Sequence, residues 1–185
     1  VHDENTNKDY TSLNMYDKKT KAFDVLLMPC DAQVSVSESL VKELRETISD
    51  ISSTVSMSDV ARAFGDKKYE TYVKIMEDIS GVKISGYAVM SSNDFKKLLN
   101  AGNTVTYHLD YAVSYRDADN VLQSIEAGDV ELDGDTAYAL MTYMDGTDDE
   151  ETRRLERAND YLTKYMEEIF TKNNNSTLAK KYDSL

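Results

Sequence analysis

The sequence predicts a mixed α/β domain in which a central sheet is flanked by helices in two or three layers. Short segments rich in β-branched and aromatic residues alternate with longer segments whose apolar residues recur every three or four positions. Strand and helix segments follow one another in a mixed order, which favours helices packed on a sheet. A chain of 185 residues can bury one sizeable core. We therefore expect a single domain over residues 1–171, followed by a polar tail at 172–185.

A hairpin is predicted near the start of the chain. Residues 10–16 and 25–28 have strand-forming composition, a charged turn joins them, and Pro29 ends the second strand. Asp9 precedes the first strand and Asp31 follows the second. Because these ends lie side by side in an antiparallel pair, the two carboxylates could share one site, and strand ends are where open α/β sheets bind ligands.

The remaining elements follow from hydrophobic periodicity and from capping residues. We expect helices over 37–51, from about 58, over 68–80 with Gly81 as its stop, over 92–102, over 136–144 and over 150–170. Strands are expected over 82–90 and 104–109, a long polar excursion over 110–129 and an acidic loop over 145–151.

Composition limits the classes of function. The net charge of −13 argues against nucleic acid or an anionic membrane surface as the main partner. Cys30 is the only cysteine, and His2 and His108 are the only histidines, so the sequence predicts no cysteine-based zinc site and no Ser-His-Asp triad. No apolar run is as long as a membrane span, and we expect any export signal or anchor to lie upstream of Val1.

A series of short motifs resembles the LytR-CpsA-Psr family of cell-envelope proteins between about Asp9 and Phe170. The matching segments, in chain order, are Asp9 to Lys21, Val25 to Asp31, Asp59 to Gly65, Gly81 to Tyr87, Asn93 to Leu99, Leu132-Asp133-Gly134 with Ala137, and Arg154 with Arg157. No single match is specific to the family, but the order and the spacing of the matches together are. The first strand of the family and its early aspartate have no clear counterpart.

The resemblance implies an extracytoplasmic domain of the Gram-positive type, usually tethered to the membrane, with an α/β/α sandwich fold. It also implies a hydrophobic tunnel for a polyprenyl chain. Family members are thought to transfer glycopolymers from a polyprenyl-pyrophosphate carrier to peptidoglycan, with Mg²⁺ at the pyrophosphate. By this resemblance Asp9, Asp31 and Arg154 are the residual catalytic candidates, Arg157 is a ligand-binding candidate, and Asp9 is the candidate metal ligand.

Three positions depart from the family's phosphate-binding arginines. Cys30 replaces the arginine of the Pro-Arg-Asp motif, and Thr142 and Met144 replace an Arg-x-Arg pair. We include all three among the ligand-binding positions. A charge-assisted hydrogen bond contributes about 1.5–3 kcal/mol, so their loss removes several kcal/mol of pyrophosphate stabilisation. We therefore expect the transfer reaction to be lost or severely weakened.

Each candidate residue also has a structural interpretation. Cys30 is either a nucleophile or a small, partly buried filler. Asp9 and Asp31 either bind Mg²⁺ or cap turns. Arg154 and Arg157 either bind phosphate or form ion pairs with Glu150, Glu151 or Asp160. The apolar stripes over 69–79 and 95–99 line either a lipid tunnel or a filled core.

Three hypotheses about function remain open at this stage. The first is a degenerate family member that binds a polyprenyl (pyro)phosphate lipid or an envelope glycopolymer without transferring it. The second is an active transferase whose missing charges come from Arg153, Lys18 or Lys19. The third is a protein-interaction or regulatory domain that keeps only the fold. We favour the first hypothesis, with Mg²⁺ as its candidate cofactor.

Overall fold

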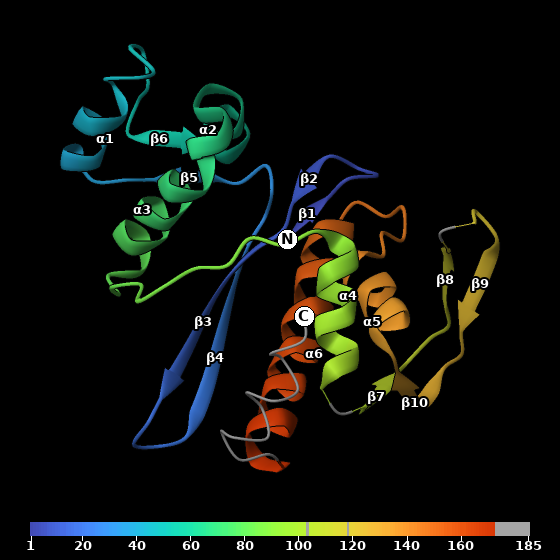
Figure 1. Cartoon of the computed structure of the whole chain (residues 1–185). Coiled ribbons are helices and arrows are strands. Elements are labelled where there is room, and N and C mark those ends of the chain that lie inside the picture. The colour runs from blue at the N-terminus through green and yellow to red at the C-terminus, as the bar shows by residue number, and fades with distance from the viewer. Residues whose placement is uncertain (103, 118, 173–185) are drawn as a thin grey trace. The chain divides into compact units, whose positions relative to one another are not determined.

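The computed structural model describes residues 1–102, 104–117 and 119–172, and the chain forms two compact units (Figure 1). The first unit contains Val1–Thr11 and Met28–Val89. The second contains Ser12–Leu27 and the chain from Met90 onward. The predicted tail at 172–185 lies outside the described residues except for Lys172, which ends the last helix.

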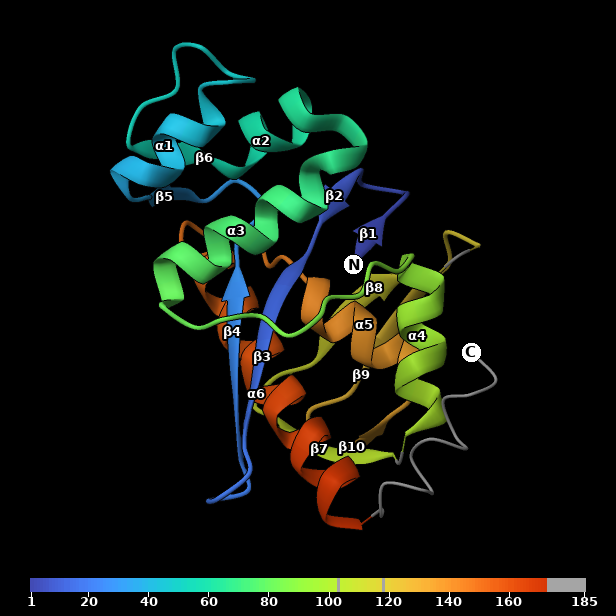
Figure 2. The same ribbon diagram turned by 60° about the vertical axis from the view of Figure 1, so that its left-hand side comes forward.

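The first unit combines helices with two short strand pairs. Its elements are β1 (His2–Asp3), β2 (Lys8–Asp9), β5 (Gln33–Ser35), α1 (Glu38–Leu44), β6 (Thr54–Ser56), α2 (Met57–Phe64), the 3₁₀ turn η1 (Gly65–Lys67) and α3 (Lys68–Ser80). Figures 1 and 2 both show α1, α2 and α3 gathered around the β5–β6 pair. Their core consists of Val36, Leu40, Val41, Leu44, Ile51, Val55, Met57, Val60, Tyr72, Ile75 and Met76.

Capping residues fix the helix ends of this unit. Ser37 caps α1 through the backbone N–H of Leu40, and Ser56 caps α2 through the backbone N–H of Asp59. The Ser37 backbone N–H and hydroxyl also donate to the carboxylate of Asp78 on α3. These bonds connect the start of α1 to the end of α3.

The second unit combines several strand pairs with three helices among its described residues. Its elements are β3 (Thr11–Asp17), β4 (Ala22–Met28), α4 (Ser92–Ala101), β7 (Val105–Leu109), β8 (Val113–Arg116), β9 (Leu122–Ile125), β10 (Gly128–Leu132), α5 (Gly134–Thr142) and α6 (Glu150–Lys172). The end residues of β3 and β4, Thr11 and Met28, belong to the first unit. Helix α5 packs against both α4 and α6 (Figure 2). Tyr161 on α6 is the largest fully buried side chain, and it contacts Tyr107 and Tyr165.

The described strands form two-stranded pairs. These are β1–β2, β3–β4, β5–β6, β7–β10 and β8–β9. Helix α3 covers the residues predicted for it, because its apolar stripe is continuous and Gly81 adopts the left-handed conformation (φ 68°) that ends a helix. The first predicted helix is shorter than expected: α1 ends at Leu44.

Two sequence predictions are wrong. Residues 82–90 form no strand, because β-branched composition alone does not supply the partner whose backbone completes a ladder. Residues 110–129 contain the β8–β9 hairpin instead of an irregular excursion. Alternate residues of a strand face opposite sides, so few residues of this hairpin are buried. Val113 and Ile125, which lie opposite each other, are the two of its described residues that join the buried core.

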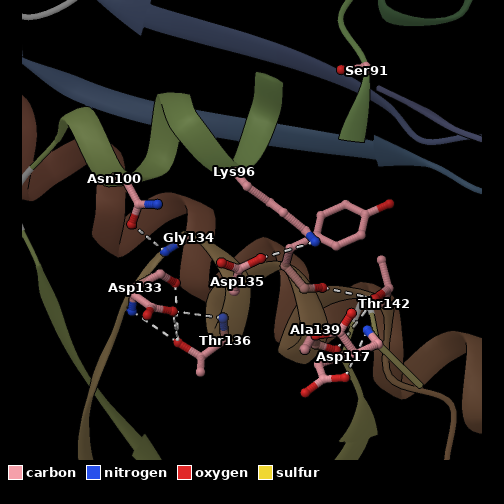
Figure 3. Close-up of polar contacts among 12 residues, drawn as sticks. Ser91, Lys96, Asn100, Asp117, Asp133, Gly134, Asp135, Thr136, Ala139 and Thr142 are labelled. Atoms are coloured by element: carbon pink, nitrogen blue, oxygen red, sulfur yellow. Dashed lines mark hydrogen bonds and ion pairs between the residues drawn. The ribbon is translucent and has the colours of Figure 1, made fainter. Parts of the chain in front are cut away.

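Gly134 is required where α5 begins beside α4 (Figure 3). Its backbone N–H donates to the Asn100 side-chain oxygen at 2.7 Å, and an added Cβ would overlap the carbonyl oxygen of Lys96. We expect Gly134→Ala to lower the free energy of unfolding by about 1–3 kcal/mol, because a backbone atom cannot move aside as a flexible side chain can.

The measurement is urea denaturation followed by circular dichroism, with Gly86→Ala as the matched control. A Cβ at Gly86 meets no atom within 4 Å, so this control should stay within about 0.5 kcal/mol of the parent. Equal stability of the two variants would show that α4 and α5 do not approach as described.

Candidate functional site

Asp9 lies at the end of β2, where three polar side chains converge on its carboxylate. Oδ2 accepts from Lys68 Nζ at 2.7 Å and from the Tyr72 hydroxyl at 3.4 Å. Oδ1 is 3.0 Å from Nδ1 of His2, the residue directly opposite Asp9 in the β1–β2 pair. Lys68 and Tyr72 are four residues apart on α3 and therefore share one helical face. We call these four residues the Asp9 cluster.

Burial and charge pairing together shift the pKa values of Asp9, Lys68 and Tyr72. Burial raises the pKa of Asp9, but hydrogen bonds from Lys68 and His2 outweigh it and hold the pKa below its ordinary value of 3.8. Burial lowers the pKa of Lys68, and the hydrogen bond and charge of Asp9 reverse this and raise it. Burial, followed by the negative charge of Asp9, raises the pKa of Tyr72. Asp9 and Lys68 are therefore an ion pair across the neutral pH range.

The residues around Asp9 do not fit a Mg²⁺ ion. Magnesium favours six oxygen ligands at about 2.0–2.1 Å, usually including one or two carboxylates. Both oxygens of Asp9 already have partners, and one of those partners is an ammonium group. A metal ion at this carboxylate would also be repelled by the Lys68 ammonium, because two like unit charges about 4 Å apart cost about 4 kcal/mol near a protein surface. Among the described residues no group of three or more His, Cys, Asp or Glu side chains could hold a metal.

Cys30 and Asp31 lie in a turn after β4. The backbone N–H of Ala32 donates to the Pro29 carbonyl at 3.1 Å and closes this turn. The Cys30 side chain is half-buried, and Asp31 is exposed. No hydrogen bond or ion pair joins Asp31 to Asp9 within the described part of the chain. The shared carboxylate site stays a prediction.

Arg154 and Arg157 are buried near the start of α6, in the second unit. Arg154 is 5% exposed and forms a two-pronged ion pair with Glu151 at 2.7 and 2.8 Å. Its Nη1 also donates to the Met141 carbonyl at 3.4 Å. The ion pair with Glu151, one of the interpretations the sequence left open, is therefore present.

Arg157 is 9% exposed and makes a different set of contacts. It donates from Nη2 to the Tyr143 carbonyl at 2.5 Å and from Nη1 to the Tyr111 hydroxyl at 3.2 Å. The Tyr143 ring lies 5.3 Å from the guanidinium carbon. The Nε–H of Arg157 is a buried donor without a hydrogen-bond partner among the described residues.

Thr142 and Met144, the positions predicted to replace an arginine pair of the family, lie beside Met141 and Tyr143, whose carbonyls accept from Arg154 and Arg157. The Thr142 hydroxyl donates to the Tyr138 carbonyl at 2.8 Å, at the end of α5 (Figure 3). The Met144 side chain is exposed. Neither side chain supplies a cation, and the arginines described at the end of α5 belong to α6.

Arg153, a sequence candidate for a replacement cation, is held by the acidic loop. Its Nε and Nη2 donate to the two oxygens of Asp145 at 2.8 and 3.0 Å. The Thr147 side chain and Arg153 hold the pKa of Asp145 at about 2. This ion pair connects the loop between α5 and α6 to the first turn of α6, and the Arg153 guanidinium is already paired with a carboxylate.

Lys68 is the contributor that the sequence analysis missed. The available signal was its spacing of four residues from Tyr72, on a helix whose apolar face was recognised. The candidate residues fall in two groups. Asp9, Cys30 and Asp31 belong to the first unit, and Thr142, Met144, Arg154 and Arg157 to the second.

Comparison with known proteins identifies the class. The model of the LytR-CpsA-Psr family matches residues 2–185, so the chain belongs to this cell-envelope-associated family. The structure resembles that of B. subtilis TagV, with 16% identity, a TM-score of 0.64 and coverage of 94% of this chain and 62% of TagV. B. subtilis TagU gives 15% identity, a TM-score of 0.55 and coverage of 95% and 68%. No curated protein matches the chain.

A third structure, of a candidate transcription regulator from Eubacterium siraeum, has 15% identity and a TM-score of 0.70, with 97% of this chain and 63% of that one covered. This chain thus spans less than two thirds of TagV and of the Eubacterium protein. The predicted mixed α/β fold class and the predicted family are confirmed. None of the helices within the described residues has the length and apolar character needed to cross a membrane.

The Asp9–Lys68 pair makes stability depend on pH at both ends of the scale. Because the folded pKa of Asp9 is lowered, its contribution is complete above 3.8 and is lost as the pH falls through the folded value. Because the folded pKa of Lys68 is raised, its contribution is complete below 10.5 and is lost as the pH rises through the folded value.

We expect Asp9→Asn to lower the free energy of unfolding at neutral pH by about 1.5–3 kcal/mol, because it leaves Lys68 without its counter-charge. This difference from the parent should shrink in acid. Urea denaturation at a series of pH values tests it, with Asp31→Asn as an exposed carboxylate control. A pH-independent difference would contradict the assigned ion pair.

Proposed function

We propose that the chain is a LytR-CpsA-Psr domain that binds a polyprenyl (pyro)phosphate lipid or an envelope glycopolymer and has lost most or all transferase activity. The family acts on cell-wall glycopolymers and lipid carriers, and this is the basis for the class of ligand. The family's location supports a position on the outer side of the membrane.

The observation that carries the proposal is how the arginines are used at the end of α5. Phosphoryl transfer depends on cations that surround the phosphates and stabilise charge in the transition state. The three positions of the family arginines hold Cys30, Thr142 and Met144. Arg154 is neutralised by Glu151, so its fork is committed to a carboxylate.

A weakened anion site is nevertheless consistent with Arg157. Its buried Nε lacks a partner among the described residues, and its two described hydrogen bonds go to neutral oxygens. No carboxylate is among these contacts, and a phosphate oxygen would satisfy the Nε–H. One such contact supports binding of a phosphate group more than it supports catalysis.

The apolar part of the ligand is supported by the family alone. Of the residues predicted to line a tunnel, Tyr72 and Met76 on α3 are buried in the core of the first unit, whereas Ile79 is exposed. Leu99 on α4 is buried in the core of the second unit. The burial of Tyr72, Met76 and Leu99 agrees with a filled core, which is the structural interpretation that the sequence left open. The polyprenyl chain is accordingly the part of the proposal that most needs a direct test.

The test compares ligands that share a chain but differ in headgroup. Geranylgeranyl pyrophosphate, geranylgeranyl phosphate and geranylgeraniol are added to the purified domain and analysed by native mass spectrometry and calorimetry. We expect binding of the phosphorylated lipids to exceed that of the alcohol. We also expect no glycopolymer transfer from a polyprenyl-pyrophosphate carrier.

Restoring the family arginines should strengthen headgroup binding. We expect each of Thr142→Arg and Met144→Arg to tighten pyrophosphate binding about tenfold or more, as a charge-assisted hydrogen bond of about 1.5–3 kcal/mol implies. Asn159→Arg adds the same charge at an exposed position on α6 and serves as the matched control.

Transfer by the parent chain that Arg154→Ala abolishes would overturn the catalytic part of the proposal and favour an active transferase. An absence of binding to all three compounds, in the parent and in the restored variants, would overturn the lipid as the ligand. If a purified envelope glycopolymer also failed to bind, a protein-interaction domain would be favoured. Equal gains from Thr142→Arg and Asn159→Arg would mean that only net charge matters.

A further inference from the structure

The Asp9 cluster contains its own cation. The Lys68 ammonium lies 2.7 Å from Asp9 Oδ2, and the two side chains are only 18% and 12% exposed. Tyr72 donates to the same oxygen, while His2 lies 3.0 Å from the other. Each carboxylate oxygen therefore has a nitrogen partner supplied by the first unit.

Lys68 is in an unusual place for a helix lysine. It is the first residue of α3, where the helix macrodipole favours negative side chains and disfavours positive ones. Asp9 compensates for this position, because its carboxylate lies against the same helix end. The Tyr69 ring, 4.9 Å from Nζ, supports the ammonium from another direction.

We propose that the Lys68 ammonium is the resident cation of the Asp9 carboxylate, in place of the divalent metal that the family resemblance implies there. An ammonium supplies the positive charge and the hydrogen bonds that keep a half-buried carboxylate ionised. It cannot be exchanged or chelated. The Asp9 carboxylate is thus satisfied without a metal ion.

The inference concerns the first unit alone and does not depend on the proposed lipid. Asp9 would be the anion whether its counter-ion is a divalent metal or Lys68, but Lys68 is covalently part of the chain. A divalent ion could bind Asp9 only after displacing Lys68 from its hydrogen bond. Removal of the lysine charge should therefore make the site accessible to metal.

The experiment measures thermal unfolding of the whole chain in EDTA and in millimolar Mg²⁺ or Mn²⁺. We expect the midpoint of the parent to be the same in each within about 1 °C. Lys68→Met should unfold at a lower temperature in EDTA and recover several degrees in Mn²⁺, because a ligand that binds only the folded state stabilises it. Lys68→Gln provides a second neutral variant in case the methionine side chain disturbs folding.

Three controls identify the responsible groups. Lys67→Met removes the neighbouring exposed lysine and should respond to metal as the parent does. Lys68→Arg keeps a cation and should also stay insensitive. The double variant Lys68→Met/Asp9→Asn should lose the recovery in Mn²⁺, because the carboxylate that would bind the metal is gone.

A rise of several degrees in Mg²⁺ for the parent chain, absent from Asp9→Asn, would overturn the inference and assign Asp9 to a metal. Folded Lys68→Met and Lys68→Gln variants without any Asp9-dependent response to Mn²⁺ would also overturn it, since the lysine would then not be what excludes metal. Both outcomes are independent of whether the chain binds lipid.

Discussion

Two buried guanidinium groups impose the strongest constraint in the second unit. Burial of a charge is costly unless it is paired and hydrogen-bonded, so Arg154 and Arg157 must find acceptors wherever α6 packs. They find them in Glu151 and in the carbonyls of Met141 and Tyr143, where α5 ends and its last C=O groups have no helical partner. The same contacts pair the charge of Arg154, give Arg157 two acceptors, cap α5 and position α6.

An equivalent constraint acts in the first unit, with the signs reversed. Asp9 is a half-buried carboxylate at a strand end, and Lys68 and His2 provide its partners. Each unit therefore neutralises the charged residue that the family resemblance marks as functional by using an oppositely charged neighbour. For Arg154 this neighbour is Glu151, and for Asp9 it is Lys68. Such pairs stabilise the fold while they reduce what the same groups can offer a ligand.

Local sequence signals predicted the helices well and the strands less well. Helix α3 is specified by a continuous apolar stripe and by Gly81, which are properties of one segment. A strand depends on a partner that may be distant in sequence. This is why 82–90 was predicted as a strand and is not one, and why the β8–β9 hairpin was hidden by its exposed polar residues. The ion pair between Arg154 and Glu151 follows from spacing on one helix and was anticipated.

The Asp9–Lys68 pair joins residues 59 positions apart, and no local pattern connects them. Sequence could identify Asp9 by its motif, but only the fold reveals which group neutralises it. The same limit applies to Arg157, whose partners Tyr111 and Tyr143 come from a loop and from the end of α5. Candidate residues were thus recognisable from the chain, whereas their protonation and availability depend on tertiary contacts.

The chain's net charge of −13 determines how much the local charge pairings matter for an anionic ligand. A strongly acidic protein repels an anionic headgroup unless concentrated positive charge offsets the general field. Arg153 is committed to Asp145 and Arg154 to Glu151, which leaves Arg157 as the buried α6 arginine whose described contacts include no carboxylate. Stabilisation of a phosphoryl-transfer transition state requires charge on several sides at once. Cys30, Thr142 and Met144 carry no positive charge that would add to that of Arg157.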